Sequence, residues 1–143
     1  MYIGLDIGTS GSKADLIDEK GNVLGSGHVS YSFSNTAGGV RELDARTVWE
    51  AVKTCLYEAA SGREADTITV SSLGEAIVPV DIEGEPVGPG IVGTDIRGAE
   101  ELEDLKKAFG TRKLTDLTGQ NLSTIYSVNK ILWLKKHQPD IYN

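Results

Sequence analysis

The chain has 143 residues, of which 39% are hydrophobic and 24% are charged, and its formal net charge is −7. This composition is typical of one soluble globular domain, and the negative charge argues against nucleic acid or an anionic membrane as a partner. No apolar run approaches the roughly 18 residues of a membrane span, and no basic stretch followed by an apolar one begins the chain. We therefore expect a cytoplasmic protein. A single cysteine, Cys55, excludes an internal disulfide.

Three strand-like segments open the chain. Residues 2–7 and 12–18 are apolar runs, and the turn Lys20-Gly21-Asn22 leads into a third run over residues 23–33. A turn centred on glycine and asparagine between two such runs favours a hairpin. The sequence therefore predicts an antiparallel meander, followed by a loop over residues 34–39.

The polar stretch between the first two strands has two interpretations. It is either an ordinary loop, in which an aspartate bonds its own backbone, or a phosphate-binding loop. In the second case glycine allows backbone N–H groups to approach an anion, while hydroxyl groups and a lysine add further donors. The residues alone leave both open. They are Asp6, Gly8, Thr9, Ser10, Gly11 and Lys13.

Helices and strands follow in a mixed order. Asp44 is a suitable N-cap for a helix whose apolar stripe from Val48 to Ala59 includes Cys55, and Gly62 is suited to end it. We expect Cys55 to pack in the core. Short strands are predicted at 67–70 (buried), 77–82 and 90–93, and helices at 98–109, 114–117 and 123–136. The pattern indicates an α/β fold with a mixed sheet.

The apolar spacing predicts which side chains of the last helices face the core. A proline also interrupts one of the predicted strands. On the last helices the inward residues are expected to be Leu102, Leu105, Phe109, Ile125, Val128 and Leu132. Pro79 within residues 77–82 indicates an edge strand or a bulge.

Five motifs, in order along nearly the whole chain, resemble the N-terminal part of the FGGY carbohydrate kinases, the group of glycerol, xylulose and gluconate kinases. The first motif alone would be weak evidence for this family, because chaperone and actin-like ATPases share it. The combination of all five is specific for the family. The motifs are Asp6-Ile-Gly-Thr-Ser10 with Lys13, Gly39-Val-Arg-Glu-Leu-Asp44, Val70-Ser-Ser-Leu-Gly-Glu75 running into Val80-Asp81, Asp95-Ile-Arg97, and Thr118-Gly119 with Lys130-Ile-Leu-Trp133.

The resemblance implies an RNase H-like, actin-like fold: a mixed sheet with three antiparallel first strands and helices on both sides. It also implies that residues 1–143 are the N-terminal domain of a truncated protein. In the family, ATP lies in a cleft between two domains, and the missing C-terminal domain supplies most of the adenine site and the aspartate that acts as general base. The implied activity is transfer of the ATP γ-phosphate to a hydroxyl of a ketose, polyol or sugar acid.

The resemblance and the chemistry together assign candidate roles. Asp6 is expected to hold Mg²⁺, through water, because Mg²⁺ gives up its waters reluctantly. Gly8, Thr9, Ser10 and Gly11 are expected to bind phosphate, and Lys13 either neutralises phosphate charge or is a solvated strand residue.

The sugar is expected to contact Glu75, Asp95 and Arg97, because carboxylates accept hydrogen bonds from paired hydroxyls. The structural alternatives are an exposed loop acid at Glu75, a helix cap at Asp95, and pairing of Arg97 with Glu100 or Glu101.

The sequence departs from the family's pattern at three places. Gly93 replaces a tryptophan, Leu73-Gly74-Glu75 differs from the motifs of both xylulose and glycerol kinases, and Ile125 stands where glycerol kinase has a tyrosine. Glycerol is therefore a poor candidate substrate.

The competing class is a non-catalytic, actin-like nucleotide-binding module, in which Glu75 and Asp95-x-Arg97 would have no role. By itself the chain is expected to be inactive, and a homodimer is possible because the surface facing the missing domain would be exposed.

Overall fold

The computed structural model describes residues 1–36 and 38–143, so the predicted loop over 34–39 lies partly outside the described residues. The chain divides into two compact units, which we treat separately. Unit 1 comprises Met1–Phe33 and Leu43–Gly74, and unit 2 comprises Ser34–Glu42 and Glu75–Asn143. Among the described residues, no helix has the length and apolar character needed to cross a membrane.

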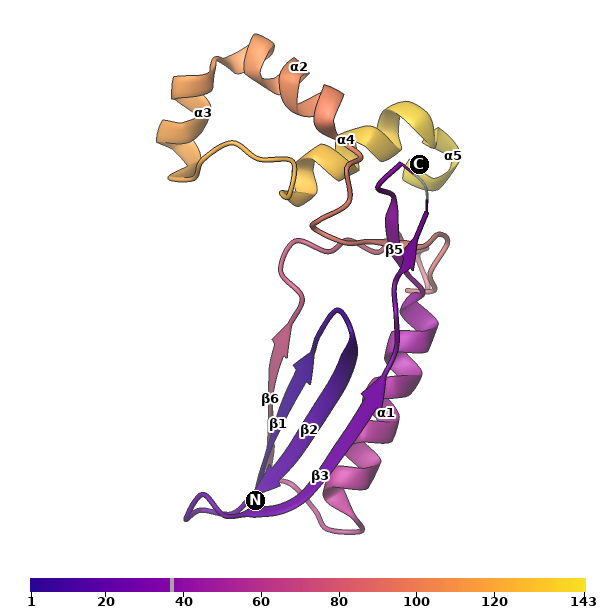
Figure 1. Cartoon of the computed structure of the whole chain (residues 1–143), viewed down its shortest axis with the longest axis vertical. Coiled ribbons are helices and arrows are strands. Elements are labelled where there is room, and N and C mark those ends of the chain that lie inside the picture. The colour runs from indigo at the N-terminus through magenta and orange to yellow at the C-terminus, as the bar shows by residue number, and fades with distance from the viewer. Residues whose placement is uncertain (37) are drawn as a thin grey trace. The chain divides into compact units, whose positions relative to one another are not determined.

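Unit 1 contains a four-stranded mixed sheet in the order β3-β2-β1-β6 (Figure 1). The strands are β1 (Tyr2–Ile7), β2 (Gly11–Ile17), β3 (Val23–Ser30) and β6 (Thr67–Ser72). The first three are antiparallel, as predicted, and β6 pairs with β1 in parallel.

Helix α1 (Ala45–Ala60) packs on one face of this sheet. Asp44 is its N-cap, as predicted, and accepts a hydrogen bond from the Arg46 N–H. The C-cap is Ser61, in a left-handed conformation, one residue before the predicted glycine. Two glycines of β3 allow the close approach, because a Cβ at Gly27 would lie 2.4 Å from the carbonyl oxygen of Cys55.

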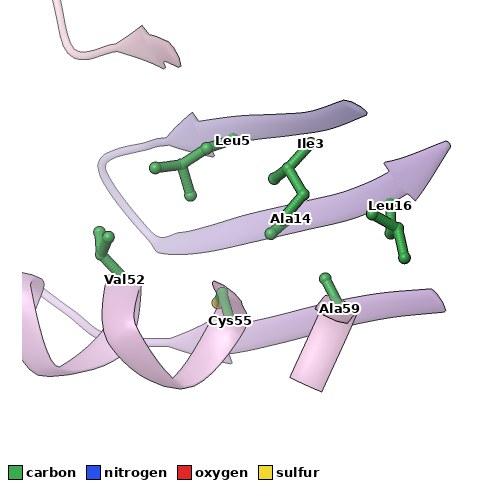
Figure 2. Close-up of a cluster of buried hydrophobic side chains, with 7 residues drawn as sticks. All are labelled: Ile3, Leu5, Ala14, Leu16, Val52, Cys55 and Ala59. Carbon is green, nitrogen blue, oxygen red and sulfur yellow. The ribbon is translucent and has the colours of Figure 1, made fainter. Parts of the chain in front are cut away.

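The core of unit 1 lies between α1 and the first two strands (Figure 2). Cys55 is fully buried there, which confirms its predicted place in the core. Its Sγ donates to the Ser12 carbonyl at 3.1 Å, and burial raises the pKa of the thiol. The thiol is therefore held in its unreactive, protonated form. The cluster comprises Ile3, Leu5, Ala14, Leu16, Val52, Cys55 and Ala59.

Strand β6 differs from its prediction as a buried strand. All six of its residues are exposed, including Ile68 and Val70. The reason is that β6 lies at the edge of the sheet, while α1 packs on β1, β2 and β3. Periodicity within a short apolar run cannot reveal how many neighbours the strand has.

The described residues of unit 2 form short strands and four helices. The three-stranded sheet β4-β5-β7 is formed by β4 (Ser34–Asn35), β5 (Arg41–Leu43) and β7 (Gly90–Ile91), with Leu43 itself assigned to unit 1. The helices are α2 (Ala99–Phe109), α3 (Thr111–Thr118), α4 (Ser127–His137) and α5 (Pro139–Tyr142). The sequence did not predict β4, β5 or α5, and the predicted loop over residues 34–39 is wrong at Ser34–Asn35, which form β4.

Two predictions for unit 2 are wrong in detail. Residues 77–82 form only isolated bridges, Ile77 with Ile91 and Val80 with Pro86, because Pro79 has no N–H to donate to a ladder. Phe109, predicted to face inward, is 51% exposed at the end of α2.

The inward face of α4 also differs. The helix begins at Ser127 rather than 123, and Val128 is half exposed, whereas Asn129, Lys130 and Leu134 are buried. Two of these three buried residues are polar, whereas the helical spacing of apolar residues predicted an apolar face.

Candidate functional site

The loop between β1 and β2 is a short, tightly bonded hairpin in unit 1. The Gly8 N–H donates to the Gly11 carbonyl at 2.9 Å. The Tyr31 hydroxyl donates to the Gly8 carbonyl at 2.7 Å and lies 3.1 Å from the Ser12 hydroxyl oxygen. These bonds fix the loop, while Thr9 and Ser10 remain exposed. Tyr31 is a supporting residue that the motif analysis missed.

The glycines of this loop have a steric reason. A Cβ at Gly11 would lie 2.7 Å from the Val29 carbonyl oxygen, and one at Gly8 would lie 3.1 Å from the Gly11 carbonyl oxygen. Only a residue without a side chain fits at Gly11. The loop therefore keeps its backbone unobstructed, which a phosphate-binding loop requires.

Asp6 and Lys13 are direct cross-strand partners. Lys13 in turn pairs with His28 on β3. All three are exposed, whereas the neighbouring Leu5 and Ala14 are buried against α1. Because side chains alternate along a strand, the three lie on the open face of the sheet. The structure thus brings the predicted acid, lysine and glycine loop to one end of one hairpin.

Glu75 stands at the N-terminus of α4 in unit 2. Its Oε2 accepts hydrogen bonds from the Ser127 N–H at 2.6 Å and the Ser127 hydroxyl at 2.8 Å. These two bonds hold the pKa of Glu75 below its usual value, so the side chain stays ionised. Glu75 also has a φ of 59°, a left-handed conformation that is uncommon outside glycine. The carboxylate is therefore fixed in position through one oxygen.

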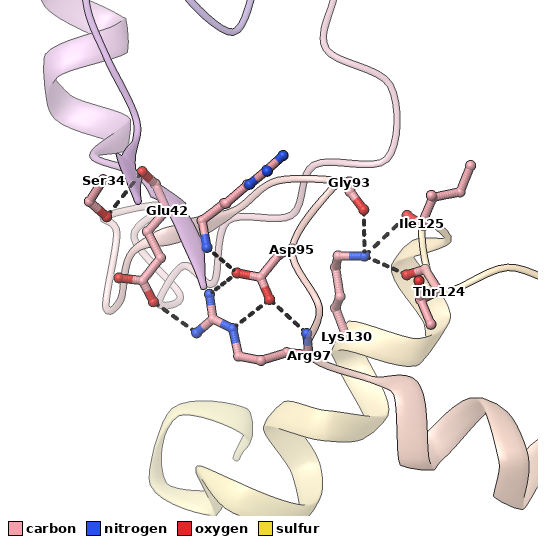
Figure 3. Close-up of polar contacts among 9 residues, drawn as sticks. Ser34, Glu42, Gly93, Asp95, Arg97, Thr124, Ile125 and Lys130 are labelled. Carbon is pink, nitrogen blue, oxygen red and sulfur yellow. Dashed lines mark hydrogen bonds and ion pairs between the residues drawn. The ribbon is translucent and has the colours of Figure 1, made fainter. Parts of the chain in front are cut away.

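Asp95 and Arg97 form a buried ion pair (Figure 3). Asp95 is 1% exposed, and its oxygens accept from the Arg97 guanidinium at 2.7 and 2.9 Å and from the N–H groups of Arg41 and Arg97. Burial by itself would raise the pKa of Asp95, but these bonds outweigh it and the pKa is lowered. The Arg97 guanidinium also pairs with Glu42 at 2.8 Å and lies over the ring of Trp133.

This geometry bears on the expected role of the pair. Arg97 bonds Asp95 and Glu42 rather than the neighbouring glutamates on α2. Glu42 belongs to the motif Gly39-Val-Arg-Glu-Leu-Asp44, but the sequence assigned it no contact with Arg97. Sugar contact by Asp95 would require one of its present bonds to be given up. Contact of Glu75, Asp95 and Arg97 with a sugar stays a prediction, as do the phosphate and metal roles of the loop.

Lys130 is a further buried charge in unit 2, beside this network in Figure 3. It is 0% exposed, and its Nζ donates to the carbonyl oxygens of Thr124 at 2.7 Å and of Gly93 and Ile125 at 3.2 Å. Burial lowers its pKa, opposed by the charges of Asp95 and Glu75. The Lys-x-x-Trp motif marked this residue but gave no sign that it is buried.

One group of metal-ligand atoms occurs among the described residues, outside the predicted site. It is formed by Glu100, Glu101 and His137. The Lys136 Nζ lies 3.4 Å from the Glu100 carboxylate and 3.6 Å from that of Glu101, so a cation of the protein already occupies the space beside both acids. Asp6, the predicted Mg²⁺ residue, is not a member of this group.

Comparison with known proteins finds the same family along the whole chain. The family model for the N-terminal domain of the FGGY family of carbohydrate kinases matches residues 1–143. Xylulose kinase of Staphylococcus xylosus is 34% identical over 143 residues, covering 98% of this chain and 30% of that protein.

Solved structures of carbohydrate kinases contain a part with the same fold as this chain. A xylulose kinase from Rhodospirillum rubrum superposes with a TM-score of 0.91 at 25% identity, over 98% of this chain and 30% of that one. Gluconate kinase from Lactobacillus acidophilus, at 22% identity, superposes with a TM-score of 0.89 over 99% of this chain and 29% of that one. The chain thus spans about 30% of the length of the curated relatives it matches. It belongs to the FGGY family of carbohydrate kinases and matches the N-terminal domain of that family.

Proposed function

We propose that this chain is the N-terminal, sugar-binding part of an ATP-dependent carbohydrate kinase with an RNase H-like, actin-like fold. The reaction moves the γ-phosphate of ATP to a hydroxyl of a ketose, polyol or sugar acid. The observation that carries the proposal is the family match over residues 1–143. A C-terminal domain would supply the adenine site and the general base.

The hairpin of unit 1 is suited to the phosphate side of this reaction. The hydroxyls of Thr9 and Ser10 and the N–H groups from Thr9 to Gly11 would donate to the γ-phosphate, while the Gly8 N–H holds the loop through the Gly11 carbonyl. Lys13 would neutralise part of the phosphate charge. Asp6 would hold Mg²⁺ through water, and its exposed carboxylate beside the glycine loop has the chemistry for this. The metal, when bound, neutralises charge that develops on the phosphoryl oxygens.

Unit 2 is suited to the sugar side. Glu75 is ionised and held at the α4 N-terminus through Oε2, so its Oε1 can accept a bond from a sugar hydroxyl. Asp95 and Arg97 would contribute to the same side, with Arg97 the more accessible of the two. A cytoplasmic location and a homodimer stay predictions.

The test is a coupled ADP-release assay on a full-length kinase that carries residues 1–143 as its N-terminal part. Pentuloses, hexuloses, polyols and sugar acids are supplied one at a time with Mg·ATP. We expect sugar-dependent ADP release with at least one of them. A rate that never exceeds the control without sugar would contradict the proposal, and so would turnover that survives replacement of Glu75 and Asp6 together.

A further inference from the structure

Lys130 is a buried cation that has no part in the proposed chemistry. It lies near the start of α4, and it is 0% exposed. Its Nζ donates to the carbonyl oxygens of Thr124, Gly93 and Ile125 (Figure 3). An ammonium group has three N–H donors, so these three acceptors match all of them and leave none for a substrate. Lys130 can therefore act only through the residues that it holds.

The loop before α4 is held by its carbonyl oxygens. Residues 123–126 present four carbonyls in a row, and each accepts a hydrogen bond from a buried side chain of α4. Lys130 bonds the middle two. The Asn129 Nδ2 bonds the outer two, those of Ser123 at 2.9 Å and Tyr126 at 3.2 Å. Side chains of a helix point back toward its N-terminus, which lets both residues reach this loop. Buried groups therefore fix the path of the chain into α4.

The loop leads directly to the group that holds Glu75. Ser127 follows residue 126, and both its N–H and its hydroxyl donate to the Glu75 Oε2. Because Glu75 is itself exposed, a displaced Ser127 would move or release its carboxylate. A path of hydrogen bonds thus runs from Lys130 through the loop to Glu75. The Lys130 bond to Gly93 anchors this path to the segment that carries Asp95.

Lys130 and Glu75 also act on each other through their charges. Burial lowers the pKa of Lys130, and the nearby charge of Arg97 adds to this, whereas the charges of Asp95 and Glu75 oppose it. The helix dipole disfavours a cation so near the N-terminus of α4 as well. In return, the pKa of Glu75 is lowered first by the two bonds from Ser127 and further by the charge of Lys130.

We propose that Lys130 is a positioning residue for sugar binding, which holds Ser127 in place so that Glu75 presents its carboxylate to the sugar. The inference rests on the proposed function, because it adds a residue to the Glu75 side of that reaction. It differs from a purely structural role, in which loss of Lys130 would weaken unit 2 without changing Glu75.

The first measurement needs no catalysis. NMR follows the titration of the Glu75 carboxyl carbon in residues 1–143, and Glu75→Gln assigns the signal. Lys130→Met keeps an unbranched side chain but removes the charge and the three donors. We expect the Glu75 titration midpoint to move to higher pH in this variant, because the bonds from Ser127 and the charge of Lys130 both lower the Glu75 pKa.

Leu134→Ala is the matched control on the same helix. Leu134 lies one turn beyond Lys130 and is 6% exposed, so its truncation also removes buried contacts of α4. Its side chain has no donor for the loop carbonyls and no charge. The Glu75 midpoint should therefore stay at its parent value. An equal shift in both variants would indicate a general loosening of α4 and would overturn the proposal.

Kinetics of the full-length kinase test the effect on the sugar. Lys130→Met should raise the sugar KM about tenfold and leave the KM for ATP within roughly twofold, whereas Leu134→Ala should leave both within roughly twofold. In a Glu75→Ala background, Lys130→Met should raise the sugar KM less than about threefold, because the contact through which it acts is already lost. A full tenfold rise in that background would contradict the path through Glu75.

A second variant and the remaining outcomes complete the test. Lys130→Gln removes the charge but keeps N–H donors for the loop, and it should raise the sugar KM less than Lys130→Met does. If circular dichroism shows that neither variant folds, Lys130 is a folding residue and the proposal is wrong. An unmoved Glu75 midpoint in folded Lys130→Met would also overturn it and leave the proposed function intact. A moved midpoint together with a full-length kinase that turns over no sugar would contradict the proposed function instead.

Discussion

Glu75 combines three properties that a sugar-orienting carboxylate needs. It is ionised because Ser127 donates two hydrogen bonds to it, it is fixed because both bonds use one oxygen, and it is exposed. Its left-handed φ of 59° costs about 1–3 kcal/mol for a residue with a side chain. A strained conformation that positions an exposed acid favours a functional role over an incidental loop acid.

Replacement of Glu75 by alanine should therefore act on one substrate. In the full-length kinase, Glu75→Ala is expected to raise the sugar KM roughly 10- to 150-fold, which corresponds to a charged hydrogen bond of about 1.5–3 kcal/mol. The KM for ATP should change less than twofold. Steady-state kinetics with each substrate varied in turn gives both values. Equal effects on the two KM values would indicate a folding role instead.

Asp6 should affect the chemical step rather than binding. Asp6→Asn keeps the shape of the side chain but removes the charge that would orient the metal in the transition state. We expect kcat to fall on the order of 10²-fold or more, with the sugar KM within threefold of the parent value. Asp15→Asn is the control, because Asp15 lies on β2 and faces the same side of the sheet as Asp6, and its kcat should be unchanged. An unchanged kcat for Asp6→Asn at saturating Mg·ATP would refute the metal role.

At the scale of elements, local patterns predicted unit 1 far better than unit 2. The alternation of β1 and the stripe of α1 directly reflect which face is buried, and Asp44 marks the helix start chemically. The predicted apolar face of α4 was wrong because tertiary contacts decide it. The predicted strand at 77–82 was wrong for a local reason, because Pro79 cannot donate to a ladder. Nothing local indicates that Lys130 would be buried against three carbonyls.

In the candidate site, too, the sequence predicted the local features better than the contacts between distant residues. The glycine hairpin is a local motif, so its residues could be found in the sequence and they come together in the structure. Glu75 was found as well, but its partner Ser127 is 52 residues away. Glu42, which bonds Arg97, is likewise distant in sequence. Pairings of this kind depend on how elements pack, and no spacing rule predicts them.

The Asp95–Arg97 pair should stabilise unit 2 measurably. Asp95→Asn leaves the Arg97 guanidinium buried with Glu42 as its remaining carboxylate partner, and loss of one member of a buried pair lowers the free energy of unfolding by about 3 kcal/mol. Urea unfolding followed by Trp133 fluorescence in a Trp49→Phe background measures it. Asp116→Asn, at an exposed pair, is the control and should change little.

The pH dependence of this effect has a definite sign. The pKa of Asp95 in the folded chain lies below its ordinary value of 3.8. Its contribution is therefore fully present above pH 3.8 and is lost as the pH falls through the lower, folded-state pKa. The difference in stability between the parent chain and Asp95→Asn should shrink in that acid range. A difference that stays constant from neutral pH to acid would mean that the Asp95 charge contributes nothing.

At the scale of the whole molecule, the chain carries residues suited to both proposed substrates, and we expect it to hold only part of the reaction centre. The candidate phosphate loop lies in unit 1 and the candidate sugar residues lie in unit 2, and the family relatives are about three times longer. Catalysis needs a base within hydrogen-bond reach of the attacking hydroxyl, with the γ-phosphate held in line with it. By resemblance, both the base and the adenine site belong to the C-terminal domain.

Residues 1–143 by themselves should therefore phosphorylate no sugar. The loop N–H groups could still hold a phosphate weakly, but no second domain would exclude water or bind adenine. A coupled ADP-release assay on the purified chain, run across pentuloses, hexuloses, polyols and sugar acids, measures this directly, with a full-length kinase carrying the same residues as the positive control. Sugar-dependent turnover by the chain alone, above the rate without sugar, would mean that a complete active site lies within these 143 residues.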